Sequence, residues 1–336
     1  MKSLPKLPRR KNYSKKSIKS AVIAEKQDSC KSIGFLEKKR KLTKKPLSMP
    51  LTHVLVNKDE TYDITKEYEF GELLGFGTYA QVKLAKCLET GKTFAVKICR
   101  GTNSIDMLKH ERDLLSKLKQ KFFPKVIDFK TDKLWNRAYL ILEYFEGPTL
   151  EQYLKENCDL SSERILDFFS QLCTIIKFLH LNKICHRDIK PQNIIVTSGN
   201  KLKLIDFNIS KKTLPGEAKS AVFMTQVSTT MYAAPEVLKG KGYDHKIDIW
   251  GLGVIGYLLL GATIDENQAR VQDEHLIRYK EFQQYVKEST KADERLRTFI
   301  YSCLEENPSN RPCYKSEEYD DFTQSIDFCG SPLIYE

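Results

Sequence analysis

Apolar and polar positions alternate with a short period from about Tyr68 onward, and turns interrupt the alternation. Residues 72–99, ELLGFGTYAQVKLAKCLETGKTFAVKIC, predict a strand, a glycine loop, a second strand, a turn and a third strand. Gly75 and Gly77 in the loop leave room for backbone amides to approach phosphates. The same two glycines are also compatible with an ordinary tight turn.

A change of period after the third predicted strand indicates a helix. Lys97 shares one face of the strand with Ala95, because side chains of a strand alternate between its faces. The following segment, SIDMLKHERDLLSKLK, predicts an amphipathic helix with Ser104 as its N-cap. Glu111 falls on the apolar stripe of this helix, where an unpaired carboxylate is costly. Glu111 therefore either pairs with Lys97 or lies in water at the edge of the stripe.

Polar residues flank a predicted hairpin in the middle of the chain. In CHRDIKPQNIIVTSGNKLKLIDF, the runs IIV and LKLI predict two short antiparallel strands, which bring Asn193 and Asp206 together. One amide oxygen and one carboxylate suit a magnesium ion that carries a polyphosphate. Asp188, on the loop before the hairpin, could accept a proton from a hydroxyl group. Lys190 could stabilise the charge of a phosphoryl group in transfer.

Composition indicates an intracellular protein without a membrane span. The longest uncharged run, 249–264, is shorter than the ~20 residues of a membrane-spanning helix, so a buried helix is expected. The basic and polar first residues do not resemble a secretory signal. Nine scattered cysteines without a CxxC pair are typical of a reducing compartment. We expect the cytoplasm, the nucleus or both.

The net charge of +11 is concentrated at one end of the chain. Residues 1–50 hold sixteen lysines and arginines against three acids, and the remainder holds 39 basic and 41 acidic residues. We expect residues 1–66 to form a disordered basic extension. Its cluster Lys38-Lys39-Arg40-Lys41 is either a nuclear-import signal or a solvated basic arm. No nucleic-acid binding is expected beyond weak contacts of this arm.

These motifs, taken in order, resemble those of eukaryotic protein kinases from about Tyr68 to about Phe322. The resemblance implies an α+β fold of two lobes, a small antiparallel sheet with one main helix (about 67–145) and a larger, mainly helical lobe (about 146–325), followed by a short tail (326–336). The matching segments are Gly75-Phe76-Gly77 with Val82, Ala95-Val96-Lys97, Glu111, His186-Arg187-Asp188 with Asn193, Asp206-Phe207, Ala234-Pro235-Glu236, Asp248 and Arg311.

The resemblance also implies a magnesium-dependent reaction, the transfer of the γ-phosphoryl group of ATP to a hydroxyl group of a protein substrate. Asp188, Lys190, Lys97 and Glu111 would be the catalytic residues, and Asn193 and Asp206 would bind Mg²⁺. The residues that would contact ATP are Leu74, Gly75, Gly77, Val82, Ala95, Lys97, Glu143, Phe145 and Ile195. Lys190 in HRDIKPQN resembles the serine/threonine class.

The segment between Asp206 and Glu236 is too long for a passive connector. Thr225 occupies a position at which the family often carries an activating phosphate. Thr229 resembles the threonine at the acceptor site. We expect regulation through phosphorylation of Thr225 by an upstream kinase, with a merely exposed threonine as the alternative.

Three positions depart from the family pattern or weaken a prediction. Asn208 replaces the glycine after Phe207, and asparagine tolerates left-handed backbone angles better than other residues with side chains. We therefore expect activity to persist, with a catalytically silent scaffold as the alternative. Gln192 and Thr149 stand where relatives that prefer basic substrates carry acids, so the sequence does not support a preference for arginine-rich targets.

Overall fold

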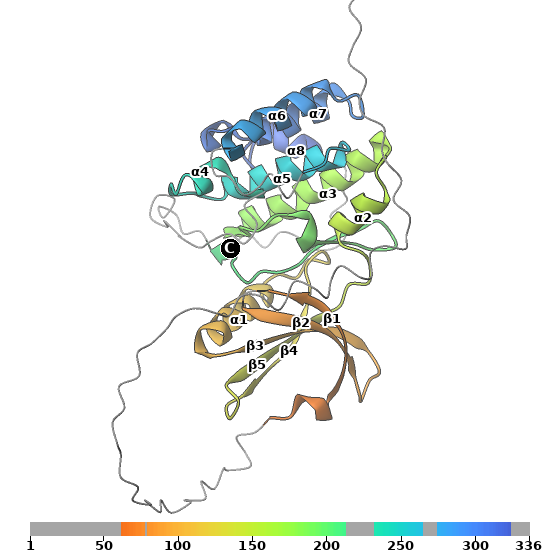
Figure 1. Cartoon of the computed structure of the whole chain (residues 1–336), viewed down its shortest axis with the longest axis vertical. Coiled ribbons are helices and arrows are strands. Elements are labelled where there is room, and N and C mark those ends of the chain that lie inside the picture. Colours follow the sequence, from red (N-terminus) through yellow and green to blue (C-terminus); the bar gives the residue numbers. More distant parts are fainter. Residues whose placement is uncertain (1–61, 78, 213–231, 265–273, 324–336) are drawn as a thin grey trace, which may run out of the picture. The chain divides into compact units, whose positions relative to one another are not determined.

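The structure, a computed structural model, describes residues 62–77, 79–212, 232–264 and 274–323, with side chains in the last range from residue 279 onward. One lobe is a five-stranded antiparallel sheet in the order β1-β2-β3-β5-β4, with α1 against β3, β4 and β5 (Figure 1). Its elements are β1 (Tyr68–Phe76), β2 (Ala80–Cys87), β3 (Thr93–Arg100), α1 (Thr102–Leu115), β4 (Val126–Asp132) and β5 (Arg137–Glu143).

The helix α1 begins earlier than the sequence predicted. Its N-cap is Gly101, with φ of 91°, and not Ser104, which lies inside the first turns. Glycine adopts such an angle without steric cost, so the chain can turn directly from β3 into the helix. The predicted apolar stripe is present, since Leu108 and Leu115 are both buried.

The folded lobe also begins earlier than residue 67. Ile64, in a 3₁₀ turn (Ile64–Lys66), is buried in a small apolar cluster on the sheet face opposite α1. The ring of Tyr62 packs edge-on against Tyr139 of β5, at 6.1 Å between centroids. Residues 62–66 therefore belong to the folded lobe, because they cover apolar side chains of the sheet that water would otherwise contact.

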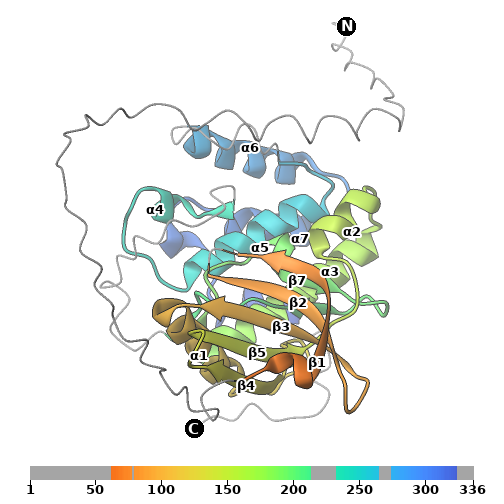
Figure 2. The same ribbon diagram turned by 60° about the horizontal axis from the view of Figure 1, so that its bottom comes forward.

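The second lobe is mainly helical (Figure 2). It also contains two small antiparallel sheets of two strands each, β6 with β9 and β7 with β8. Its elements are α2 (Leu150–Glu156), α3 (Ser162–Leu181), β6 (Ile184–Cys185), a 3₁₀ turn (Pro191–Asn193), β7 (Ile194–Val196), β8 (Leu202–Leu204), β9 (Lys211–Lys212), α4 (Pro235–Leu238), α5 (Lys246–Leu259), α6 (Glu274–Glu288), α7 (Glu294–Cys303), a 3₁₀ turn (Pro308–Asn310) and α8 (Glu317–Thr323).

One continuous apolar core joins the two lobes. It runs from Leu108 and Leu115 of α1, through Phe123 and Phe207, into α3 and α5. The uncharged run at 249–264 lies largely in α5 as a buried helix, as the sequence predicted. In the described part of the chain, no helix combines the length and apolarity that crossing a bilayer requires.

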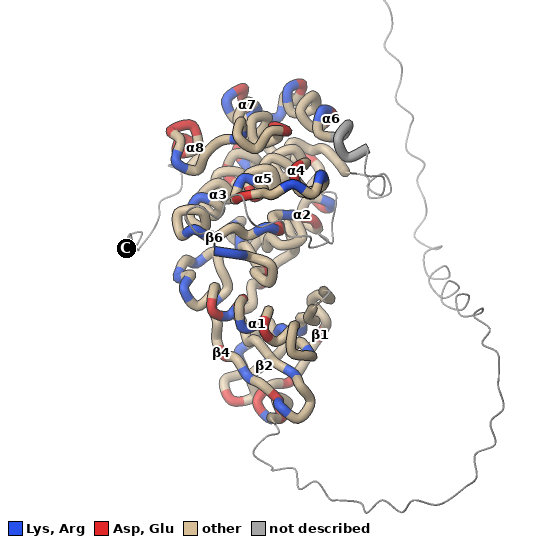
Figure 3. The backbone as a smooth tube through the Cα atoms, turned by 90° about the vertical axis from the view of Figure 1, so that its left-hand side faces the viewer, with Lys and Arg blue, Asp and Glu red and all other residues tan. Residues whose placement is uncertain are grey.

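Acidic and basic positions are interspersed along the described chain (Figure 3). This distribution agrees with the near-balance of charge outside the first fifty residues. The basic extension lies outside the described residues, apart from residues 62–66 at its end.

Candidate active site

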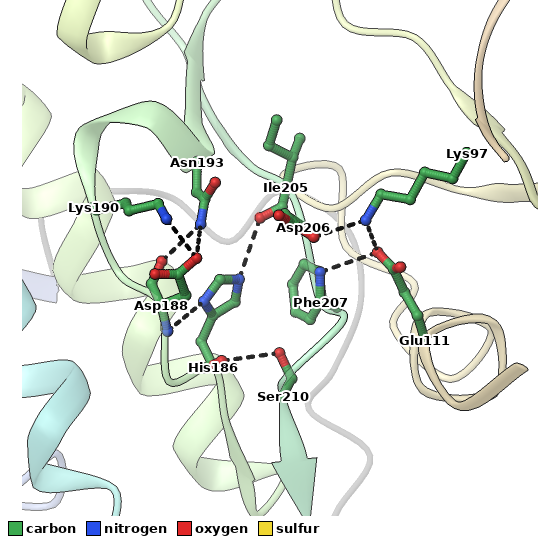
Figure 4. Close-up of polar contacts among 10 residues, drawn as sticks. All are labelled: Lys97, Glu111, His186, Asp188, Lys190, Asn193, Ile205, Asp206, Phe207 and Ser210. Carbon is green, nitrogen blue, oxygen red and sulfur yellow. Dashed lines mark hydrogen bonds and ion pairs between the residues drawn. The ribbon is translucent and has the colours of Figure 1, made fainter. Parts of the chain in front are cut away.

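Lys97 links three elements through its ammonium group. Its Nζ lies 2.5 Å from Oε1 of Glu111 on α1 and 2.8 Å from Oδ1 of Asp206, which follows β8 (Figure 4). Glu111 is fully buried and Lys97 is 7% exposed. The same Oε1 of Glu111 accepts a hydrogen bond from the backbone N–H of Phe207 at 3.1 Å. The predicted pairing of Lys97 with Glu111 is therefore confirmed, and Glu111 does not lie in water.

The electrostatics of this group favour a permanent cation at Lys97. Burial by itself lowers the pKa of Lys97, but the carboxylates of Asp206 and Glu111 raise it above its ordinary value. Burial raises the pKa of Asp206, but the charge and hydrogen bond of Lys97 outweigh burial and hold that pKa below its usual range. Lys97 is thus charged, and Asp206 is a carboxylate.

A second group surrounds Asp188 on the loop before β7. Oδ2 of Asp188 accepts a hydrogen bond from Nδ2 of Asn193 at 2.8 Å and pairs with Nζ of Lys190 at 2.8 Å. Nδ2 of Asn193 also donates to the backbone oxygen of Asp188 at 2.9 Å. Because Pro191–Asn193 is a 3₁₀ turn, the chain folds back so that Asn193 faces Asp188. Figure 4 shows Asp206 between this group and Lys97.

His186 connects the loop to the segment of Asp206. Burial lowers the pKa of His186, so its imidazole is neutral. Its Nε2 lies 3.2 Å from the backbone oxygen of Ile205, and its Nδ1 lies 3.3 Å from the backbone nitrogen of Asp188. A neutral ring that donates from Nε2 and accepts at Nδ1 satisfies both contacts. The hydroxyl of Ser210 donates to the backbone oxygen of His186 at 3.1 Å.

The left-handed residue of this segment is Asp206 and not Asn208. Among the described residues, five residues other than glycine have a positive φ. Asp206, at 67°, is one of them, and Asn208 is not. The left-handed backbone conformation that a glycine at position 208 would allow therefore occurs two residues earlier, at Asp206. Asparagine also tolerates the conformation that Asn208 adopts, and nothing in the contacts of Asp206 involves its side chain.

A buried carboxylate, Asp248 on α5, holds the loop that contains His186 and Arg187. It accepts hydrogen bonds from the backbone N–H groups of His186 and Arg187, both at 2.8 Å. Its Oδ2 also lies 2.9 Å from Nε2 of His180 on α3. Asp248 matched a family position in the sequence, whereas His180 belonged to no motif there. The available signal was a single histidine within the otherwise apolar run TIIKFLHLNKI of a buried helix.

The side chains of Asn193 and Asp206 fit a magnesium ion bound together with phosphates. The hydrogen bonds of Asn193 to Asp188 use its amide nitrogen, so its oxygen points to the other side, as Figure 4 shows. Asp206 keeps a side chain that is 32% exposed. The part of the chain that the structure describes has no group of three or more His, Cys, Asp or Glu side chains that could hold a metal ion. Mg²⁺ needs no such group when phosphates and waters complete its shell.

An apolar surface lies beside Lys97 on the same face of the sheet. Val82 is opposite Lys97 in the pairing of β2 with β3, and Leu142 is opposite Ala95 in the pairing of β3 with β5. Directly opposed residues share a face. The other residues predicted to contact ATP are Leu74 and Gly75 on β1, Gly77 just after it, Glu143 at the end of β5, Phe145 just beyond it, and Ile195 on β7.

A buried ion pair fixes the end of the segment after Asp206. Both carboxylate oxygens of Glu236 on α4 accept hydrogen bonds from the guanidinium of Arg311, at 2.6 and 2.7 Å. Both residues are among the positions that matched the family pattern in the sequence. Thr225 and Thr229, the predicted regulatory residues, lie outside the described residues.

Comparison with known proteins identifies a family that covers most of the chain. The family described as "Protein kinase domain" matches residues 68–322. A relative in Arabidopsis thaliana, the SNF1-related protein kinase catalytic subunit alpha KIN12, is 33% identical over 211 residues, which are 61% of this chain and 42% of the relative.

Two further relatives carry the words serine/threonine-protein kinase in their names. CBL-interacting serine/threonine-protein kinase 8 of Arabidopsis thaliana is 34% identical over 59% of this chain and 45% of its own length. Serine/threonine-protein kinase cds1 of Schizosaccharomyces pombe is 35% identical over 59% of this chain and 45% of its own length. The chain thus spans less than half the length of these curated relatives.

Proposed function

This chain belongs to the protein kinase family, and we propose that it transfers the γ-phosphoryl group of ATP to serine and threonine hydroxyls of protein substrates. The observation that carries the proposal is the position of Lys97, whose ammonium lies within 2.8 Å of carboxylates on both α1 and the segment after β8. A cation held in this way, beside an apolar surface, suits the phosphates and the base of one nucleotide.

Each polar side chain has a task in this proposal. Lys97, held by Glu111, binds the α- and β-phosphates. Asp188 accepts the proton of the substrate hydroxyl as a general base. General-base catalysis typically accelerates a reaction by ~10²–10⁴-fold. Lys190, 2.8 Å from Asp188, stabilises the charge of the phosphoryl group in transfer.

Asn193 and Asp206 would hold Mg²⁺, which supplies positive charge at the phosphates and orients them. The protein contributes an amide oxygen and a carboxylate fixed by their contacts to Asp188 and Lys97. Adenine would lie against Val82, Ala95 and Ile195 and would pair with the backbone of Glu143 and Phe145. Leu74, Gly75 and Gly77 would close over the nucleotide.

Regulation by phosphorylation of Thr225, through an upstream kinase, belongs to the same proposal. A phosphate there adds roughly −2 charge, and Arg187 and Lys211 are the basic residues expected to pair with it. Thr229 would contribute to recognition of the acceptor hydroxyl. We place the protein in the cytoplasm, the nucleus or both, with protein substrates as its partners. The basic extension is a weak contact for polyanions at most.

Transfer of labelled phosphate from γ-labelled ATP to a generic basic protein, with Mg²⁺ supplied, tests this function. We expect label on serine and threonine, and a loss of at least about 100-fold in Asp188→Asn, which removes the proton acceptor. Asp159→Asn is the matched control, because that side chain is 88% exposed and forms only a surface pair with Lys291. Equal background labelling by the unmodified protein and Asp188→Asn would support a silent scaffold instead.

A further inference from the structure

A basic surface that the proposed function does not use lies on the segment between α1 and β4. Residues 117–125, KLKQKFFPK, contain four lysines and no acid. All four lysines, Lys117, Lys119, Lys121 and Lys125, are exposed. This segment differs from the rest of the described chain, in which acidic and basic positions are interspersed (Figure 3).

Lys203 on β8 adds a fifth positive charge beside this segment. Its Nζ donates a hydrogen bond to the backbone oxygen of Lys121 at 2.6 Å, and it lies 5.1 Å from the centroid of the Phe145 ring. Burial lowers the pKa of Lys203, the carboxylate of Glu143 raises it, and the charge of Lys121 lowers it further. We call these five lysines the lysine patch.

The lysine patch lacks carboxylate partners. Within the residues that the structure describes, none of its five ammonium groups forms an ion pair with an acid, whereas Lys130 pairs with Asp128 at 2.9 Å. Glu143 lies beside the patch, but its Oε2 accepts a hydrogen bond from the backbone N–H of Lys125, at 3.2 Å. The like charges of the patch therefore repel one another, and an anionic partner would relieve this repulsion.

The backbone that carries these lysines is held in place by the fold. The backbone oxygen of Phe122 accepts a hydrogen bond from the N–H of Leu204 on β8 at 2.9 Å, and the N–H of Phe123 donates to the oxygen of Gln120 at 3.1 Å. Leu118 and Phe123 are buried in the core that joins the lobes. Because the segment is ordered in advance, a partner that binds it loses less of its affinity to ordering entropy.

The side chains around the lysines favour one class of anionic partner. The rings of Phe122 and Phe123 pack edge-on against each other at 4.6 Å, and both contact Phe178. The ring of Phe145 is covered by Lys203. These rings are used within the fold, so they do not provide the stacking platforms of a surface that binds single-stranded nucleic acid. They also do not provide the apolar anchors of a surface that binds a bilayer.

We propose that the lysine patch is a docking surface for an acidic segment of a partner protein. Lys117 and Lys125 are eight residues apart, so their Cα atoms are separated by at most about 29 Å. A run of about eight aspartates or glutamates in extended conformation covers this length. Each exposed pair of a lysine and a carboxylate contributes little, so the affinity is the sum of several pairs and falls as salt is added.

This inference goes beyond the proposed function and does not depend on it. No lysine of the patch has a role in phosphoryl transfer, and docking requires neither ATP nor Mg²⁺. Binding can therefore be measured without an assay of activity.

The experiment uses the full chain and a labelled peptide of eight glutamates, with a peptide of eight glutamines as the uncharged reference. A carbodiimide joins lysine amines to carboxylates that touch them, and mass spectrometry identifies the lysines that are joined. We expect cross-links to the glutamate peptide on the lysine patch. We expect few on Lys86 of β2 and Lys92 of the turn after it, which are also exposed.

Two matched double variants test the same surface by affinity. Lys119→Glu combined with Lys121→Glu should weaken binding of the glutamate peptide by about tenfold, because two attractions become repulsions. Lys86→Glu combined with Lys92→Glu changes the net charge equally and should leave the affinity within about twofold. The basic extension is the same in both variants, so it does not contribute to the difference between them.

Two results would decide against the proposal. Equal losses of affinity in the two double variants, or cross-links spread evenly over exposed lysines, would overturn the docking surface and leave only a general attraction to a basic protein. Tighter binding of an oligouridine than of the glutamate peptide, with the same loss in Lys119→Glu combined with Lys121→Glu, would assign the patch to nucleic acid instead. Neither result bears on phosphoryl transfer, which the assay with labelled ATP tests separately.

Discussion

At the scale of single residues, the buried charge of Lys97 requires a functional explanation. Moving an ammonium out of water costs several kcal/mol, and a buried ion pair often contributes little net stability. Lys97 is 7% exposed and has two carboxylate partners, Glu111 and Asp206. This arrangement holds a cation in one position before any ligand binds, which is the property that electrostatic catalysis needs.

The half-buried histidine His245 makes the stability of the protein depend on pH. Its ring packs at 5.0 Å from His180 and at 5.4 Å from Tyr314. Burial and the neighbouring His180 lower the pKa of His245 to about 4, although Asp244 and Asp248 act in the opposite direction. An unfolded histidine has a pKa of about 6.5, so the unfolded state binds the proton more readily.

We therefore predict that the free energy of unfolding falls as the pH drops from about 6.5 toward 4, with a contribution from His245 on the order of 2 kcal/mol. His245→Phe keeps the ring contacts but cannot bind a proton, so its stability should fall less over this range. Urea unfolding of both proteins at pH 7.5 and pH 5 measures the difference, in which titrating groups that do not interact with His245 cancel. Equal losses in the two proteins would show that His245 does not titrate as described.

At the scale of elements, α5 supports the catalytic loop through close contacts at its glycines. A Cβ atom on Gly251 would lie 2.8 Å from both Cβ and the backbone oxygen of Ile189, the residue after Asp188. A Cβ atom on Gly253 would lie 2.8 Å from Cβ of Cys303 on α7. Helix α5 thus touches the loop on one side and α7 on the other.

Alanine at either position should destabilise the protein, although the helix propensity of alanine is better than that of glycine by about 1 kcal/mol. Overpacking costs typically ~1–3 kcal/mol, so both thermal midpoints should fall. Gly251→Ala should also lower kcat, because it displaces Ile189 beside Asp188, whereas Gly253→Ala should keep kcat near that of the unmodified protein at a temperature where both are folded. Equal effects on kcat would contradict this separation.

Local sequence patterns predicted which segments form helices and strands. They predicted less well where α1 begins and which elements pack against each other. The pairing of Lys97 with Glu111 followed from two patterns of side chains, the alternation along a strand and the apolar stripe of a helix. The N-cap at Ser104 was wrong, because the φ of Gly101 depends on how β3 meets α1. The contact between Glu151 and Gln192 could not be predicted, since it depends on the packing of α2 against a turn about forty residues away.

At the scale of the whole molecule, the order of motifs predicted the two-lobed fold, and the family match at residues 68–322 confirmed it. The first boundary was placed too late, because the apolar side chains of Tyr62 and Ile64 are too few to form a periodic pattern. The convergence of Asp188, Asn193 and Asp206 near Lys97 arises only when both lobes pack on one core.

The central claim is that these four side chains serve one nucleotide and its magnesium ion. The most direct test is the affinity for ATP, measured by calorimetry with and without Mg²⁺, for the unmodified chain, Asp206→Asn and the control Asp159→Asn. We predict that Mg²⁺ strengthens ATP binding in the unmodified chain and the control. In Asp206→Asn, the increase in ATP affinity caused by Mg²⁺ should be smaller by about tenfold or more. An identical response to Mg²⁺ in all three proteins would contradict the account.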